Sequence, residues 1–413
     1  MARSVLIAPF RVRAFRLQWP ADLLTSWGIE MEILILGWYI LVETGSVWLL
    51  TVFGSLQYMG TLIAPVFGMA GDRFGHRNVL CAMRTFYAVL AAIVMVMAFA
   101  GVLTPFYALV IAGLSGIVRP SDIAMRSALV AEMMPGDRLM AAMGVSRTTS
   151  DSARIMGSLF GAALLALLGV GPAYLAITLF YVGGLALTYA MGSPLGRTHP
   201  PGSVRLSFPR EVSEGLGYVW RTPCLLAGMW IAFLVNLAAF PMTSGLLPYV
   251  ARDIYHIGQT GLGTLVASFS GGAFIGSIVV SLAGRALRPA RTMVVFTMAW
   301  YVLVLAFVQM PGPASGRIML VLAGCAQSLS MVPLSTMLLH VSGERFRGRV
   351  MGVRMLAIYG LPLGLLGAGW LIERIGFVAM ATGYCVFGLI VTLAIAVRWR
   401  AAIWPLDVPA NAR

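Results

Sequence analysis

The sequence contains no lysine and has few charged residues of either sign. All 29 basic residues are arginines, 15 residues are acidic, and charged residues make up only 11% of the 413 positions. A water-soluble domain of this length carries about twice that share of charge. The shortage excludes an ordinary soluble protein and indicates that most of the chain is surrounded by lipid.

Cysteine and histidine are also scarce, with four residues of each. Cys81, Cys224, Cys325 and Cys385 lie far apart in apolar stretches, so they offer neither a disulfide framework nor a metal or redox pair. The sequence also lacks a phosphate-binding glycine loop, zinc-ligand spacing and a nucleophile triad. We therefore expect no cofactor, no bound metal and no enzymatic activity.

Long apolar stretches dominate what is present. Hydrophobic residues make up 59% of the chain, and the mean hydropathy is +0.88. The net charge of +14 could suggest a nucleic-acid partner, but the arginines are spread among short connections and form no single basic face. The composition predicts an all-α integral membrane protein in contact with the lipid bilayer, without a nucleic-acid partner.

The apolar stretches predict twelve transmembrane helices, because about 20 apolar residues cross a bilayer. Most arginines fall in the amino-terminal segment, the carboxyl-terminal segment and alternate connections, which predicts an inner (plasma) membrane protein with both termini in the cytoplasm. The expected spans are 21–43, 47–69, 79–101, 105–128, 142–166, 172–192, 223–248, 260–283, 292–310, 318–340, 351–371 and 377–397.

The two halves of the chain resemble each other. Pro135-Gly-Asp-Arg138 followed by Met143-Gly-Val145 recurs about half a chain later as Ser342-Gly-Glu-Arg345 followed by Met351-Gly-Val353. This duplication predicts two pseudo-symmetric six-helix bundles. We expect the bundles at residues 1–192 and 223–413, joined by a proline-rich cytoplasmic linker, 193–222, with an amphipathic helix in its second part.

A polar, glycine-rich segment lies between the second and third spans: Gly68-Met-Ala-Gly-Asp-Arg-Phe-Gly-His-Arg77. It resembles the loop between helices two and three of the major facilitator superfamily. The resemblance implies a cytoplasmic gate formed by Gly68, Asp72, Arg73, Gly75 and Arg77, with Asp72 beside the start of helix eleven. The two glycines are expected to allow close backbone approach and positive φ in a short turn.

Three further stretches narrow the resemblance. EGLGYVWRTP after the linker, GERFRGRVMGV before span eleven and ARIMGSLFGAALLALLG in span five look like the macrolide-efflux and enterobactin-exporter branch of that superfamily. The resemblance covers nearly the whole chain and implies a secondary transporter that works by alternating access. Span five has Gly157 and Gly161 but lacks the glycine–proline pair of proton antiporters, and the simplest interpretation of the glycines is close helix packing.

Ionisable residues inside the predicted spans are confined to the first half, and each needs a partner, a water-filled cavity or a function. Besides Arg84 and the two glutamates of span one, they form two sets on single helix faces, at spacings of three and four residues. Two interpretations stay open: a structural network between spans four and five, or direct handling of substrate or protons. The two sets are Arg119, Asp122 and Arg126, and Arg147, Asp151 and Arg154.

Glu30 and Glu32 lie near the middle of span one, about 14–17 Å from its cytoplasmic end. Their separation of two residues turns them about 200° apart, so they cannot face the same cavity. Because desolvation favours the neutral form of a carboxyl group, either glutamate is a candidate proton carrier or a hydrogen-bonded structural residue. A weak preference goes to Glu30, whose helix face is more polar and aromatic.

Together these features predict a monomeric, proton-coupled antiporter that exports amphipathic, drug-like small molecules. One alternative is export of a siderophore or another anionic metabolite, with Arg119 or Arg154 as the anion partner. A different class of function is a lipid-handling or sensory membrane protein with the same fold.

Overall fold

The computed structural model describes residues 8–192, 208–283 and 287–404, and all regular elements in these ranges are helices. Eleven helices are long and apolar enough to cross a membrane, and a bent pair, Val47–Thr61 with Val66–Phe74, gives a twelfth span if it is counted as one. The prediction of an all-α membrane protein with twelve spans is confirmed. The amino-terminal residues 1–7 and most of the predicted linker, 193–207, lie outside the described residues.

The chain divides into two compact units, which are described separately. Unit 1 comprises Met1–Gly45, Leu56–Val204 and Gly258–Ala267, and unit 2 comprises Ser46–Ser55, Arg205–Ile257 and Ser268–Arg413. Unit 1 is formed mainly by the first half of the chain and unit 2 mainly by the second half. The two exceptions are Gly258–Ala267, which belongs to unit 1, and Ser46–Ser55, which belongs to unit 2.

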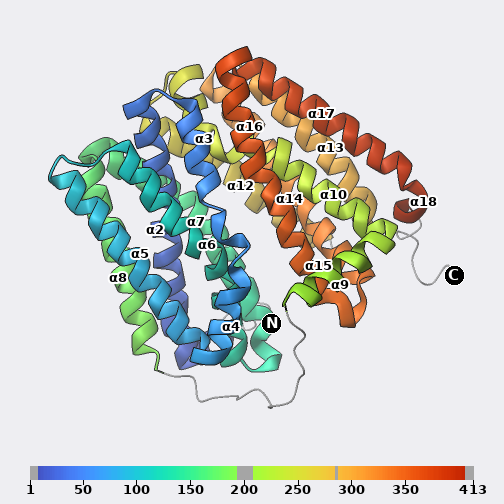
Figure 1. Ribbon diagram of the computed structural model, residues 1–413, viewed down its shortest axis with the longest axis horizontal. Coiled ribbons are helices and arrows are strands. Elements are labelled where there is room, and N and C mark those ends of the chain that lie inside the picture. Colours follow the sequence, from blue (N-terminus) through green and yellow to red (C-terminus); the bar gives the residue numbers. More distant parts are fainter. Residues whose placement is uncertain (1–7, 193–207, 284–286, 405–413) are drawn as a thin grey trace. The chain divides into compact units, whose positions relative to one another are not determined.

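In unit 1 the long helix α2 contacts α6, α7 and α8, while α5 lies alongside α8 (Figure 1). α2 therefore presents different faces to three neighbours. The helices of this unit are η1 (Ala8–Arg11), α2 (Arg13–Thr44), η2 (Met59–Thr61), α4 (Ala64–Phe74), α5 (His76–Phe99), α6 (Pro105–Met133), α7 (Gly136–Leu168) and α8 (Val170–Ala190).

In unit 2, α13 packs along α14, α10 contacts α16 and α17, and the linker helix α9 packs on α15. The remaining helices, including α3 and α12, whose residues are divided between the two units, are α3 (Val47–Leu56), α9 (Phe208–Arg221), α10 (Pro223–Ala238), η3 (Pro241–Gly245), α11 (Leu247–Tyr249), η4 (Val250–Ile254), α12 (Gln259–Ala283), α13 (Pro289–Val308), α14 (Pro313–Val341), α15 (Gly343–Leu356), η6 (Ala357–Tyr359), α16 (Gly360–Ile375), α17 (Phe377–Arg398) and α18 (Arg400–Ile403).

The contacts of helix α9 explain why its sequence is amphipathic. Glu214 forms an ion pair with Arg349 of α15 at 2.8 Å, and Tyr218 stacks on Phe346 with ring centroids 4.3 Å apart. Trp220, by contrast, is exposed. One face of the linker helix is therefore fixed to α15, and the other presents an aromatic side chain suited to a membrane surface.

The expected span 47–69 is a bent pair of helices and not one straight helix. The structure breaks it after Leu56 and bends it by 49° before α4. At the break the backbone lies in close contact with α6. A Cβ added at Gly116 of α6 would collide with the carbonyl oxygen of Leu56. Such close approach is possible only without a side chain, and no hydropathy pattern reports it. Span eleven also begins earlier than expected, since its apolar helix runs over Phe346–Ile375.

We predict that Gly116→Ala destabilises the protein, because the added methyl group meets backbone that cannot move aside. Overpacking of this kind costs about 1–3 kcal/mol. Gly113→Ala is the matched control, since its Cβ would meet only the Leu56 side chain at 3.8 Å. The measurement is the apparent melting temperature of each purified variant in detergent. Equal melting temperatures for the two variants would argue against the close contact between α6 and Leu56.

Candidate functional site

Three acidic residues of α2 each meet an arginine from a different helix. Asp22 pairs with Arg84 of α5, Glu30 lies near Arg154 of α7, and Glu32 lies near Arg119 of α6. Because α2 runs through the middle of unit 1, its carboxylates reach cations on several sides. The charges that sequence analysis assigned to separate spans are thus connected through one helix.

Glu32 is buried, and both of its carboxylate oxygens have partners. Its Oε1 lies 3.3 Å from Arg119 Nη2, and its side chain is only 5% exposed. Tyr181 donates a hydrogen bond to Oε2 at 2.8 Å, and Ser115 donates to Oε1 at 3.4 Å. Arg119 also donates to Gln57. These contacts join α2 to α6 and α8.

Glu30 has a different environment. Its Oε1 lies 3.7 Å from Arg154 Nε, and the two side chains are 23% and 50% exposed, respectively. The small residue Gly157 brings α7 close to this point: a Cβ there would lie 2.9 Å from Glu30 Cβ. The predicted packing role of Gly157 is confirmed. The resulting ion pair is loose and accessible, although it lies near the middle of a helix that crosses the membrane.

The two sets of charged residues contain the expected internal pairs. Asp122 pairs with Arg126, and Asp151 lies 3.3 Å from Arg147, whose side chain is largely exposed. Arg126 also donates to Ser26 of α2 at 2.5 Å. Arg119, Arg126 and Arg154 connect the two sets to α2, and Arg119 also donates to Gln57. The sequence allows a network directly between spans four and five; the described side-chain contacts instead pass through α2.

Sequence analysis missed Asp22. It accepts hydrogen bonds from Gln18 at 2.7 Å and from Arg84, and Arg126 Nε lies 3.7 Å from it. Arg84 also donates to Thr188 of α8. Asp22 was overlooked because it falls at the edge of the predicted first span. The available signal was Arg84, since a buried arginine within a span requires an acidic partner.

The predicted gate segment is mostly helical, which corrects the expectation of a polar turn from Gly68 to Arg77. α4 continues through Phe74, and Gly75 alone links it to α5. Gly75 has φ +86°, a conformation that suits glycine. Gly68 lies within α4, and an added Cβ there would meet nothing within 4 Å. Only Gly75 therefore has the positive φ that was expected of both glycines.

The charged residues of this segment differ in their environments. Asp72 and Arg73 are exposed on the last turn of α4. Arg77 donates to the carbonyl oxygens of Thr188 at 3.2 Å and Tyr189 at 2.6 Å. A cation at the end of α8 favourably meets the partial negative charge of its last carbonyls. Arg77 therefore fastens the start of α5 to the end of α8.

Within the described ranges, no group of three or more His, Cys, Asp or Glu side chains is arranged to hold a metal ion. The cluster around α2 consists of ion pairs and hydroxyl groups.

Solved transporter structures have the same fold, although they share little sequence with this chain. A POT family peptide transporter in an auto-inhibited form gives a TM-score of 0.72 at 12% identity and covers 94% of this chain and 97% of its own. A D-xylose–proton symporter gives 0.70 at 12% identity over 93% and 96%. A bacterial homolog of the human lysosomal transporter Spinster, inward-facing and unoccupied, gives 0.67 at 13% identity over 96% and 97%.

No curated protein matches the sequence. The family model described as Major Facilitator Superfamily, however, matches residues 21–363, which is most of the chain and includes every charged residue of the α2 cluster. The match agrees with the twelve predicted spans and with the fold of the solved transporters. This chain belongs to the major facilitator superfamily and is a multi-pass membrane transporter of the secondary type.

Proposed function

We propose that this protein is a proton-coupled antiporter that exports amphipathic, drug-like small molecules from the cytoplasm. The observation that carries the proposal is the loose, partly exposed pair between Glu30 and Arg154. A charged pair in the middle of a membrane helix is costly unless water or substrate reaches it. Its exposure supports access from an aqueous pathway, as a proton carrier needs.

The coupling we propose uses the Glu30 carboxyl group as the proton site. When Glu30 takes up a proton, its negative charge is lost and the attraction to Arg154 across 3.7 Å disappears. The freed guanidinium then takes Asp151 as its partner. Loss of the proton to the cytoplasm restores the pair. A substrate that binds only while the Glu30 carboxylate is charged competes with the proton. Such a substrate is therefore transported in exchange for a proton.

Glu32 has a different role in this proposal. Its carboxylate already pairs with Arg119 and accepts hydrogen bonds from Tyr181 and Ser115, so a change of partner would break several favourable contacts at once. We assign Glu32, Asp22 and Asp122 to a structural network that keeps α2 fixed against α5, α6 and α8. Glu30 then remains the carboxylate of α2 that changes its partner during transport.

Alternating access would move the two predicted bundles, 1–192 and 223–413, about the bound substrate, with 193–222 as their tether. In this proposal Asp72 is a cytoplasmic gate charge near residues 350–353, Arg73 assists it, and both termini are in the cytoplasm of the inner membrane. The monomer is the transporting unit. The resemblance of three sequence stretches to the macrolide-efflux and enterobactin-exporter branch supports export rather than uptake.

The second candidate is export of a siderophore or another anionic metabolite. The observation that favours it is Arg154, whose side chain is half exposed and only loosely paired. An accessible guanidinium binds a carboxylate or phosphate through two N–H groups. Transport screening in proteoliposomes against cationic dyes, macrolides and siderophores distinguishes the two candidates by the charge of the compounds that are moved.

We predict that Glu30→Gln and Glu32→Gln have different effects in proteoliposomes with an imposed pH gradient. Glutamine keeps the shape and hydrogen-bonding capacity of glutamate but cannot carry the proton. Glu30→Gln should lose gradient-driven transport of a dye or macrolide found in the screen while still exchanging it across the membrane. Glu32→Gln should mainly lower stability, because Arg119 remains buried without its acid. Normal gradient-driven transport by both variants would show that neither glutamate of α2 carries the coupled proton.

We predict that Asp72→Asn slows transport without reducing the amount of protein in the membrane. The residue is exposed at the end of α4, so the change removes a charge from the proposed gate without creating a cavity. The measurement is the initial transport rate at matched protein amounts. Glu132→Gln, which removes an acid that pairs with His76 at 2.5 Å near the same end of unit 1, is the control for a simple loss of charge. Wild-type rates for Asp72→Asn would contradict the gate assignment.

A further inference from the structure

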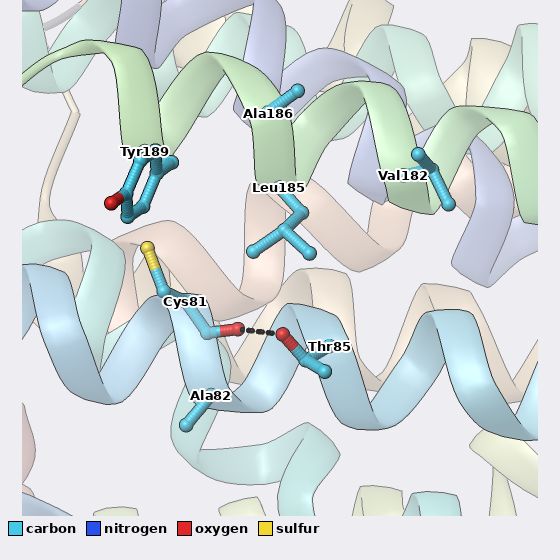
Figure 2. Close-up of a pocket in the computed structure, with 7 residues that line it drawn as sticks. All are labelled: Cys81, Ala82, Thr85, Val182, Leu185, Ala186 and Tyr189. Carbon is cyan, nitrogen blue, oxygen red and sulfur yellow. Dashed lines mark hydrogen bonds between the residues drawn. The ribbon is translucent and has the colours of Figure 1, made fainter.

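A surface groove of about 410 Å³ lies between α5 and α8 in unit 1. Cys81 and Thr85 of α5 line one side, and Leu185, Ala186 and Tyr189 of α8 line the other. Figure 2 shows Tyr189 and the Cys81 thiol facing each other at one end, with Leu185 further along between the helices. The Thr85 hydroxyl is not free, because it donates to the Cys81 carbonyl oxygen at 2.9 Å. The groove wall is therefore apolar.

This groove belongs to a face that contacts lipid. The exposed side chains along α5 and α8 next to the groove are large and hydrophobic, among them Val89, Ile93, Leu179 and Val182. On α8 they recur at three- and four-residue intervals and form one stripe, which ends at Tyr189. In a membrane transporter such a stripe is covered by acyl chains. The space in the groove is thus accessible to a lipid tail.

A positive charge stands at the Tyr189 end. Arg77, Cys81 and Thr85 follow one another at four-residue intervals and so share one face of α5. The guanidinium carbon of Arg77 lies 5.3 Å from the centre of the Tyr189 ring. Its hydrogen bonds go to the carbonyls of Thr188 and Tyr189 and to Asn78 Oδ1, which are all neutral oxygens.

Arg77 therefore keeps both charge and hydrogen-bonding capacity. An arginine has five N–H donors, and these three contacts leave two. Backbone carbonyls orient the guanidinium but do not neutralise it. A phosphate group can use the remaining donors and supplies the missing negative charge. The apolar groove and the oriented cation lie next to each other, as the tail and the headgroup of a phospholipid require.

We propose that this groove is a binding site for an anionic phospholipid, with one acyl chain between α5 and α8 and the headgroup phosphate at Arg77. The ligand comes from the cytoplasmic leaflet, given the orientation proposed above, and that leaflet is rich in anionic lipids. The site lies away from the Glu30–Arg154 pair and is independent of the transported compound. Bound lipid would reinforce the junction that Arg77 makes between α5 and α8.

The native cysteine provides a reporter for occupancy. Cys224 and Cys385 are buried, whereas Cys81 and Cys325 are partly exposed. In a Cys325→Ala background, the rate of N-ethylmaleimide reaction therefore reports access to Cys81. The full chain is reconstituted in phosphatidylcholine vesicles with and without phosphatidylglycerol, and native mass spectrometry counts the lipids retained by the purified protein. We expect phosphatidylglycerol to slow the labelling of Cys81 and to be retained in preference to phosphatidylcholine.

Two pairs of variants test the two parts of the site. Arg77→Gln should lower the preference for phosphatidylglycerol about fivefold, whereas Arg16→Gln, outside the groove, should keep it. Ala186→Phe fills the groove and should reduce retention of phosphatidylglycerol while Arg77 remains. Leu179→Phe, two turns away on the same exposed stripe, should not. If Arg77→Gln does not fold, the comparison of Ala186→Phe with Leu179→Phe still tests whether lipid binds in the groove. Equal labelling in both kinds of vesicle, or equal retention by Ala186→Phe and Leu179→Phe, overturns the proposal.

Discussion

The cost of placing charge in a membrane is the constraint on which unit 1 depends. An isolated ionised side chain in hydrocarbon is unfavourable by several kcal/mol. α2 meets this cost by pairing Asp22, Glu30 and Glu32 with arginines of α5, α7 and α6. The same ion pairs fix which face of α2 each neighbour contacts. The charged network is thus a packing constraint first, and the transport role that we propose rests on the one pair that stays loose.

The loose ion pair of Glu30 distinguishes it from Glu32, which is only two positions further along α2. Glu32 is buried and contacts Arg119, Tyr181 and Ser115. Glu30 has a partner at 3.7 Å and remains partly exposed. The helical turn of about 200° between them sends one carboxylate into the interior of unit 1 and the other toward α7. A network and a switch can therefore occupy the same short stretch of one helix.

The sequence predicts the parts of this account that depend on local pattern. Hydropathy locates the spans, small residues such as Gly157 mark close helix packing, and the spacing of Glu30 and Glu32 separates their directions. Contacts between distant residues leave no such pattern. Asp22 and Arg84 are far apart in the chain, and the break after Leu56 depends on the backbone of α6 at Gly116. The segment before Gly75 has a loop-like composition, yet α4 continues through it.

In the mechanism that we propose, Glu30 releases a proton when substrate binds. The most direct measurement is proton release from the purified protein in weakly buffered detergent solution, on addition of a dye or macrolide that it transports. The account predicts release by the wild type and by Asp72→Asn, and none by Glu30→Gln even though that variant still binds the compound. Undiminished proton release by Glu30→Gln would contradict it.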